Sequence, residues 1–130
     1  MDNKLNIKEG LLEFNARVTK IEQGSLPQIY VVTFIGDENT QLIGDIHEYI
    51  QIFSNNQKVK IVISREKPNY RENKDFCGSG YLFQKRKEND LNVIFISIGG
   101  LLFKLITLME LNKAFNIMDK VYLCISGEDK

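Results

Sequence analysis

The side chains of this chain best suited to chemistry are two cysteines, Cys77 and Cys124, and a single histidine, His47. A structural zinc site takes about four ligands, so we expect no bound metal, and we expect no other cofactor. Two cysteines do not make a disulfide framework. They could pair, but we expect two reduced, buried thiols acting as small apolar side chains in a cytoplasmic protein. His47 stands in a segment that we interpret as a polar turn, which favours a solvated imidazole over a catalytic base.

Other short motifs also give little support for an enzyme. The Gly78-Ser79-Gly80 segment lacks the following glycine, lysine and helix of a phosphate-binding loop. Asp75 and Cys77 stand close together, but a turn leading into a strand explains both. Because so few of the groups that catalysis needs are present, we expect no catalytic residues and no small-molecule substrate. A small hydrolase or transferase is kept as the third alternative.

The charge balance is neutral, with 17 Lys and Arg against 17 Asp and Glu. Proteins that bind nucleic acid tightly through phosphate contacts usually carry an excess of cations. Two basic clusters nevertheless suggest a stand-alone barrel that binds single-stranded nucleic acid as the second alternative. Neighbouring acidic residues dilute both clusters, which favours an ordinary solvated surface. The candidate cations are Lys58, Lys60, Lys85, Arg86 and Lys87, and the candidate stacking residues are Tyr30, Tyr81 and Tyr122.

The hydrophobic pattern predicts an all-β fold, because apolar residues alternate with polar ones in several short runs separated by turn residues. The phase of the first run slips near Thr19-Lys20, which predicts a β-bulge. We expect one domain over residues 1–130, an antiparallel barrel of about eight strands with at most one short helix or an irregular turn at 108–115. The expected strands are 12–18, 29–35, 41–53 with a bend near Gly44-Asp45, 58–64, 77–85, 93–98, 101–106 and 121–125.

The run from Val93 to Ile106 is the most apolar part of the chain. It is shorter than the roughly 20 residues of a membrane-spanning helix and carries Lys104, so we expect no membrane association. The polar segment Met1 to Lys8 likewise predicts no secretory signal. Because Gly99 and Gly100 interrupt the run, it is interpreted as two buried strands with a break between them, where the backbone bends or another chain approaches closely.

Four segments together resemble one protein family, the eighth-subunit family of DNA-directed RNA polymerase. The most distinctive is Ile-Ser-Ile-Gly-Gly-Leu-Leu-Phe-Lys-Leu, residues 96–105. The short connection between Ser64 and Phe76 is similar to the archaeal form, known as the G subunit, since the eukaryotic form has a long insertion there. In order and spacing the segments cover nearly the whole chain beyond Val18. The other matching segments are 42–47 with 51–53 and 58–64, then 76–81, and finally 119–123.

The resemblance implies a barrel like that of oligonucleotide/oligosaccharide-binding (OB) folds and a non-catalytic auxiliary subunit. It implies docking on the periphery of the assembled polymerase, mainly against the largest subunit, with DNA and RNA contacted only through the complex. It carries over no catalytic or metal residues. A glycine bend confined to the monomer would explain the Gly-Gly run equally well. We expect part of its surface to bind the partner, with Gly99, Gly100, Leu101, Leu102, Phe103 and Tyr81 as the candidate residues.

Overall fold

The computed structural model describes residues 6–37, 39–47, 53–69, 75–111 and 114–127 of the chain. Within these residues every regular element is a β-strand, and no helix is present that could span a membrane. The strands are β1 (Asn6–Lys8), β2 (Leu11–Gln23), β3 (Ile29–Gly36), β4 (Gln41–His47), β5 (Lys58–Ser64), β6 (Asp75–Glu88), β7 (Leu91–Ile98), β8 (Leu101–Thr107) and β9 (Lys120–Gly127).

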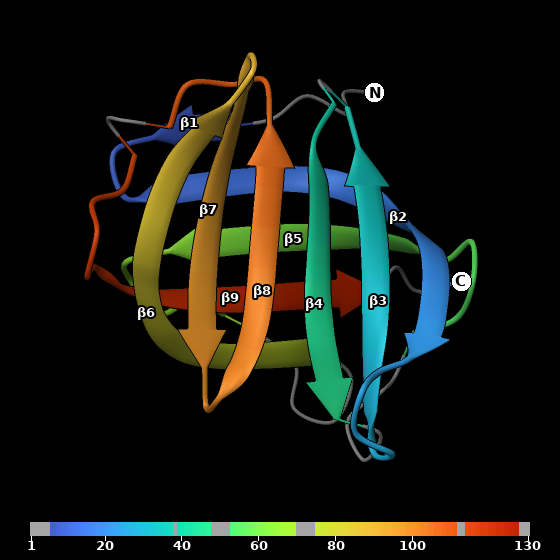
Figure 1. The fold of residues 1–130 in the computed structure, drawn as a ribbon. Coiled ribbons are helices and arrows are strands. Elements are labelled where there is room, and N and C mark those ends of the chain that lie inside the picture. The colour runs from blue at the N-terminus through green and yellow to red at the C-terminus, as the bar shows by residue number, and fades with distance from the viewer. Residues whose placement is uncertain (1–5, 38, 48–52, 70–74, 112–113, 128–130) are drawn as a thin grey trace.

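The sheet closes on itself, and all its pairings are antiparallel. The strand order is β1-β2-β3-β4-β8-β7-β6-β9-β5, and a further pairing between β2 and β5 shuts the barrel. β1 is an extra short strand on β2, and each of the other eight strands matches one of the predicted runs. Figure 1 shows β3, β4, β8 and β7 standing upright in front of β2, β5 and β9, which run across behind them. The prediction of an all-β antiparallel barrel is confirmed.

The long strand β2 belongs to both layers because a bulge redirects it. Its first half pairs with β5 and its second half pairs with β3. The register with β3 shifts between Val18 and Lys20, where the alternating burial of the strand also ends. A bulge adds a residue to one strand and sharpens the local bend. The bulge predicted near Thr19-Lys20 is therefore confirmed, and it marks a corner of the barrel.

The other corner strand is β6, which pairs with β9 through residues 75–81 and with β7 through residues 81–88. Figure 1 shows it curving from the front layer to the lower edge of the barrel. Gly80 lies at this corner, where a Cβ atom would collide with the carbonyl oxygen of Ser97. A second register shift, between Leu82 and Gln84, follows immediately. Glycine and the bulge together let β6 pass close to β7 while changing direction.

Inward-facing apolar side chains from all eight barrel strands form the buried core. The rings of Phe34 and Phe53 meet edge to face at 5.4 Å, and those of Phe76 and Phe103 lie 5.8 Å apart. The Phe103 ring occupies the space that a side chain at residue 44 would need, which explains why that position is glycine. The core thus fixes β8 against β4 and orients the outward residues of both strands.

Three local expectations differ from the structure. No bend interrupts β4 near Gly44-Asp45, since the strand runs without a break from Gln41 to His47. His47 is the last residue of that strand, opposite Ile29, rather than part of a polar turn. The described part of 108–115 is irregular, which is one of the two forms that we expected, a short helix or an irregular turn. Residues 112–113 lie outside the described residues. So do residues 48–52, which make up most of the predicted extension of β4.

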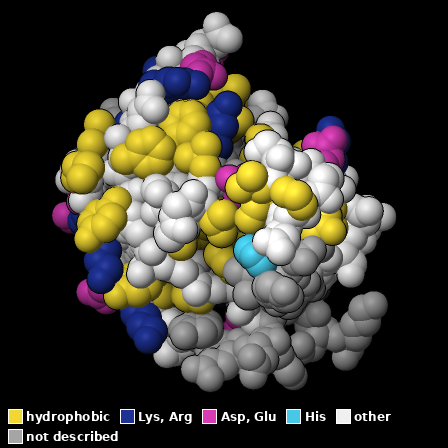
Figure 2. Space-filling model, turned by 60° about the horizontal axis from the view of Figure 1, so that its bottom comes forward, with side chains coloured by type: hydrophobic (Ala, Val, Ile, Leu, Met, Phe, Trp, Pro, Cys, Tyr) yellow, Lys and Arg dark blue, Asp and Glu magenta, His cyan; other side chains and the backbone are white. Residues whose placement is uncertain are grey.

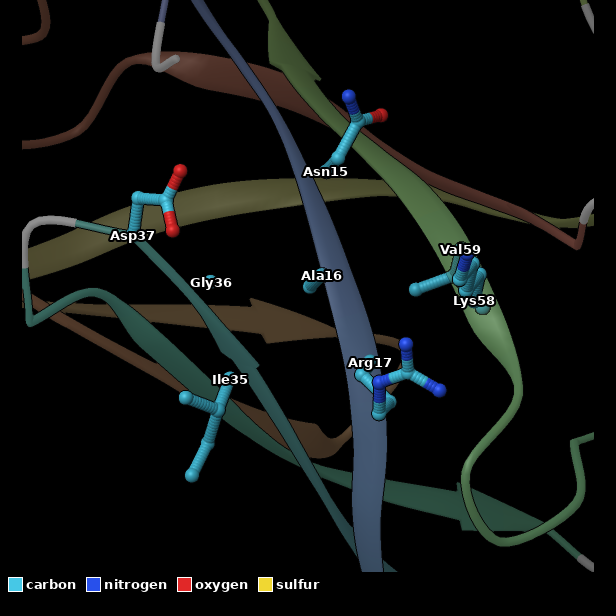
Figure 3. Close-up of a pocket in the computed structure, with 8 residues that line it drawn as sticks. All are labelled: Asn15, Ala16, Arg17, Ile35, Gly36, Asp37, Lys58 and Val59. Atoms are coloured by element: carbon cyan, nitrogen blue, oxygen red, sulfur yellow. The ribbon is translucent and has the colours of Figure 1, made fainter. Parts of the chain in front are cut away.

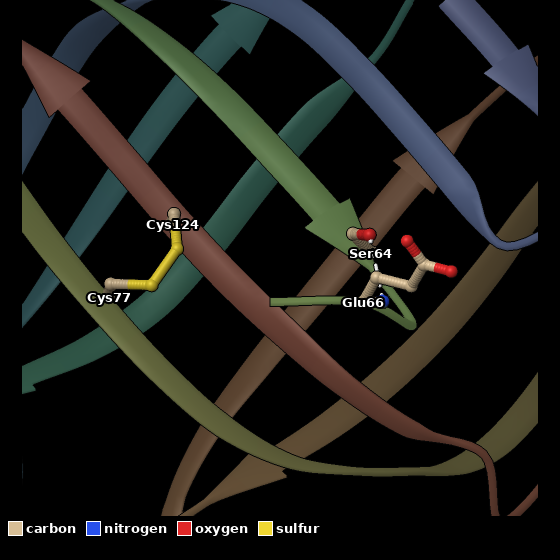
Figure 4. Close-up of a disulfide and its surroundings, with 4 residues drawn as sticks. All are labelled: Ser64, Glu66, Cys77 and Cys124. Carbon is tan, nitrogen blue, oxygen red and sulfur yellow. Dashed lines mark hydrogen bonds between the residues drawn. A yellow bond between two sulfur atoms is a disulfide. The ribbon is translucent and has the colours of Figure 1, made fainter. Parts of the chain in front are cut away.

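Cys77 and Cys124 are joined in a disulfide, so the expectation of two free thiols is wrong. The two residues are direct neighbours across β6 and β9, with their Cα atoms 4.0 Å apart. Figure 4 shows the bond linking these strands. It also shows the end of the neighbouring strand β5, where the Ser64 hydroxyl accepts a hydrogen bond from the Glu66 backbone N–H at 3.0 Å. The number of cysteines did not reveal the pairing, because the register of two strands 47 residues apart decides it.

Candidate docking surface

A tight turn joins β7 to β8 at the predicted break in the apolar run. Ile98 pairs with Leu101, which leaves Gly99 and Gly100 as a two-residue loop with φ angles of +57° and +86°. Two successive positive φ angles are typical of the type I′ hairpin turn, which matches the twist of the strands it joins. Both glycines are exposed. In the part of the chain that the structure describes, no heavy atom other than those of each glycine and its chain neighbours lies within 4 Å of where their Cβ atoms would stand. The turn is therefore a narrow, open tip at the end of the hairpin.

The residues after the turn alternate between the core and the outer surface. Phe103 is fully buried, and Leu101 is partly buried against the core. Leu102 faces outward and is 42% exposed, next to Ser97 of β7. Ser97 in turn pairs with Tyr81 of β6, which is 50% exposed. Two of the predicted partner-binding residues, Leu102 and Tyr81, thus stand on one row across three strands, while Phe103 supports that row from inside.

Aromatic side chains extend this row along β6 and β7. Phe83, which is 41% exposed at the bulge, lies 6.1 Å from the ring of Phe95. The Arg86 guanidinium lies 4.9 Å from the centre of the Phe95 ring, and the Lys104 ammonium lies 5.7 Å from it. These distances are within the range of cation–π attraction. We name this surface the docking face: Tyr81, Phe83, Phe95 and Leu102, with the cations Arg86 and Lys104.

Phe83 and Phe95 were predicted to lie in strands, but no surface role was predicted for either. Alternation in the β7 segment gave a signal, since Phe95 falls between the inward residues Ile94 and Ile96. The bulge at residue 83 breaks the alternation of β6, so the sequence pattern did not indicate that Phe83 is exposed. On the face of the molecule drawn in Figure 2, hydrophobic side chains with Lys and Arg between them gather along the left and upper left.

Three of the five candidate nucleic-acid cations have partners within the chain. The Lys60 ammonium forms an ion pair with Glu13 at 2.9 Å, and this hydrogen bond is the main reason why the pKa of Glu13 is lowered. The Lys85 ammonium donates to the carbonyl oxygen of Phe115 at 2.9 Å. Arg86 forms an ion pair with Glu88 at 2.6 Å. The charges of Lys60 and Arg86 are therefore partly compensated, and the Lys85 ammonium is bound to a backbone carbonyl. Both facts weaken the case for a phosphate-binding surface.

The two predicted basic clusters also lie on different parts of the barrel. Lys58 and Lys60 are on β5, which pairs with β2 and β9, whereas residues 85–87 are in the half of β6 that pairs with β7. Among the candidate stacking residues, Tyr30 packs against the core, and the Lys120 ammonium lies over the Tyr122 ring at 5.7 Å. Tyr81 belongs to the docking face. Arg86 and Tyr81 share the docking face, but the other predicted cations and tyrosines are not gathered with them into one surface.

A polar groove of about 310 Å³ lies over β2, between the end of β3 and the start of β5. Arg17 and Lys58 are direct cross-strand neighbours on one side of it, and Figure 3 shows Asp37 on the other side. Arg17 also donates to the carbonyl oxygen of Asn56 at 2.9 Å. The groove thus presents charges of both signs. Among the residues that the structure describes, no group of three or more His, Cys, Asp or Glu side chains is arranged to hold a metal.

The fold and this surface define an all-β barrel protein with an exposed aromatic and aliphatic face. Comparison with protein families identifies it further. The family model for the G subunit of DNA-directed RNA polymerase matches residues 11–128, and the chain belongs to this family.

Individual relatives agree with this assignment. The chain is 39% identical over 118 residues to DNA-directed RNA polymerase subunit Rpo8 of Sulfolobus acidocaldarius, covering 88% of this chain and 97% of the relative. It is 36% identical over 119 residues to the Rpo8 subunit of Saccharolobus solfataricus, covering 85% and 89% of the two chains. The Rpo8 subunit of Saccharolobus shibatae is 32% identical over 120 residues. A molybdate-bound structure of the cytoplasmic protein ModG aligns at a TM-score of 0.38 and 11% identity over 88% of this chain and 89% of ModG.

Proposed function

We propose that this chain, as one barrel domain, is a non-catalytic auxiliary subunit that supports the assembly or stability of RNA polymerase in transcription. Membership of the G-subunit family implies assembly with the multi-subunit enzyme. The observation that supports a docking role is the row of exposed apolar residues across β6, β7 and β8, which includes Leu102 and Tyr81. In this proposal the docking face binds the largest subunit of a cytoplasmic enzyme, and DNA and RNA are contacted only through the complex.

The composition of the docking face fits this role. Tyr and Arg are enriched among the residues that dominate protein–protein binding energy, and they cluster where neighbouring apolar contacts exclude water. Arg86 and Lys104 are held beside the Phe95 ring, so part of their conformational entropy is already lost before a partner binds. Gly99 and Gly100, with no side chains, would let a partner backbone approach the hairpin tip closely.

The experiment is capture of the tagged chain from an extract of its native cells. We expect the polymerase subunits to be recovered with it, at one copy of this chain for each enzyme. Leu102→Asp places a charge within the docking face, on β8, and should reduce recovery at least about tenfold. Leu26, 63% exposed in the turn between β2 and β3, gives a matched control, since Leu26→Asp should not change recovery. Normal recovery of a folded Leu102→Asp chain would refute this docking surface.

The alternative, a stand-alone protein that binds single-stranded nucleic acid, is favoured by one observation. Arg17 and Lys58 face each other across β2 and β5, and like charges in such a pair repel unless an anion lies between them. This alternative predicts salt-dependent binding of a single-stranded oligonucleotide that is weakened by Lys58→Glu and Lys60→Glu. Failure of the purified chain to bind the oligonucleotide at low salt would eliminate it.

A further inference from the structure

A four-residue turn, Asn116–Asp119, leads into β9 and contains a strained residue. The Asp119 N–H donates to the carbonyl oxygen of Asn116 at 3.1 Å, and Met118 has a φ angle of +76°. A positive φ at the third residue of a turn is typical of type II turns, where glycine is preferred. A methionine there is in a conformation that residues with a side chain rarely adopt. Something other than turn formation must therefore account for a side chain at this position.

The turn is held rigidly by its surroundings. The Asp119 carboxylate oxygen Oδ2 accepts hydrogen bonds from the Asn116 N–H at 2.7 Å and from Nε of Arg65 at 3.0 Å. Two backbone hydrogen bonds then fasten the turn to β6. The Met118 N–H donates to the carbonyl oxygen of Leu82 at 2.6 Å, and the Leu82 N–H donates to the carbonyl oxygen of Asp119 at 3.0 Å. Such contacts hold a strained backbone in one conformation.

This rigid turn displays two adjacent apolar side chains to solvent. Ile117 is 53% exposed and Met118 is 65% exposed. Because Met118 is hydrogen-bonded to Leu82, the turn lies beside the residues of the docking face on either side of Leu82, Tyr81 and Phe83. The two exposed apolar residues of this turn therefore lie next to the β6 side of the docking face.

The charges around the turn have both signs, since Arg65 also faces the exposed carboxylate of Glu9 at 3.8 Å. The carboxylate of the turn itself, Asp119, is paired with Arg65 at 2.9 Å. The next residue, Lys120, is exposed, with its ammonium over the Tyr122 ring. A protein surface that fits here would be apolar opposite residues 117 and 118 and acidic opposite Lys120, since complementary charges suit an interface.

We propose that Ile117 and Met118 form a preformed apolar knob that enters an apolar pocket with an acidic rim on a neighbouring protein subunit of the polymerase. This inference rests on the proposed function and extends the docking face by a second site of contact. A rigid turn loses little conformational entropy on binding, and the unbranched, polarizable methionine side chain fits irregular pockets well. The strained methionine is then explained by the contact that its side chain makes.

The test compares binding and folding of the same full-length variants. Met118→Gly removes the knob and replaces the residue with one that adopts φ +76° without strain, so its thermal stability should stay close to that of the unaltered chain. Polymerase reconstituted without this subunit is titrated with the fluorescently labelled chain. We expect Met118→Gly combined with Ile117→Ser to weaken binding at least about tenfold. Leu26→Ser, an equally exposed apolar residue in another turn, should bind normally.

The outcomes separate this inference from the proposed function. If the folded 117/118 variant binds as tightly as the unaltered chain while Leu102→Asp does not, the knob is refuted and the docking face stands. If the unaltered chain does not bind the polymerase at all, the proposed function is refuted, and the inference that rests on it is refuted with it. A photo-crosslinking residue at position 118 identifies the occupant. It should link to a polymerase subunit, and a link to nucleic acid, or no link in the assembled enzyme, would overturn the proposal.

Discussion

Arg65 binds Asp119 through two nitrogen atoms that approach the same carboxylate oxygen, Nη2 at 2.9 Å and Nε at 3.0 Å. The two residues are 54 positions apart, one following β5 and the other preceding β9. Both side chains are mostly buried, with 31% of Arg65 and 22% of Asp119 exposed. Because Oδ2 of Asp119 also accepts the Asn116 N–H, this one oxygen connects the end of β5 to the turn that carries Ile117 and Met118.

Asp119→Ala should therefore loosen that turn. The variant loses the hydrogen bonds of this oxygen and leaves the Arg65 guanidinium with the more distant, exposed carboxylate of Glu9 at 3.8 Å. This should lower the free energy of unfolding by about 2–3 kcal/mol. Urea unfolding at neutral pH measures the change. Asp119→Asn keeps an acceptor oxygen but not the charge, so its free energy of unfolding should fall by less than that of Asp119→Ala. Equal stability of Asp119→Ala and the unaltered chain would show that the turn is held by other contacts.

The turn between β7 and β8 gives a prediction with a matched pair of variants. Gly99→Asn should be tolerated, since asparagine adopts positive φ angles and is common at the first position of type I′ turns. Gly99→Val should lower the free energy of unfolding by about 1–2 kcal/mol, because a β-branched side chain is unfavourable at φ +57°. Open space surrounds this position, so the cost comes from the backbone alone. Equal losses of unfolding free energy in Gly99→Asn and Gly99→Val would mean that side-chain crowding, and not the positive φ angle, determines the cost.

The ion pair between Lys60 and Glu13 predicts a small dependence of stability on pH. Its hydrogen bond lowers the pKa of Glu13 below the ordinary value of 4.5. The pair therefore stabilises the folded chain above pH 4.5, and this contribution is lost as the pH falls through the lowered pKa. Lys60 is more than half exposed, so Glu13→Gln should cost at most about 1 kcal/mol at pH 7. The difference between the two chains should shrink as the pH falls below 4.5 and vanish below the lowered pKa of Glu13. Urea unfolding at each pH measures it, and a constant difference would contradict this assignment.

The disulfide between Cys77 and Cys124 should contribute measurably to stability. It closes a loop between residues 47 positions apart, and removing such a cross-link typically costs about 2–4 kcal/mol. Thermal unfolding with and without a reducing agent measures the effect. The double variant Cys77→Ala with Cys124→Ala should be insensitive to the reducing agent. Two free thiols in the folded, untreated chain would contradict the assignment.

The strands were predictable because each has a regular hydrophobic pattern bounded by turn residues. Alternation placed Leu12 and Phe14 in the core, and the break in phase located the bulge after Val18. The pair Gly99-Gly100 located the hairpin turn for the same local reason. These features depend on neighbouring residues in the sequence, which one chain displays directly.

Features that depend on register were not predictable. The disulfide, the contact of Arg65 with Asp119 and the grouping of Phe83 with Phe95 each join residues of different elements. The basic residue Lys60 looked available in the sequence, but the β2–β5 register places it beside Glu13. The candidate docking residues Leu102 and Tyr81 could be named from the sequence, whereas the aromatic pair beside them becomes visible only when β6 and β7 are aligned.

The central claim is that the docking face is covered when the chain joins the polymerase, and oxidative footprinting tests this most directly. Hydroxyl radicals modify exposed aromatic and aliphatic side chains, and mass spectrometry reports the modification of each peptide. We predict that Tyr81, Phe83 and Leu102 are modified in the free chain and several-fold less in the assembled enzyme, while Leu26 is modified equally in both. Equal modification of Tyr81, Phe83 and Leu102 in both states would contradict the claim.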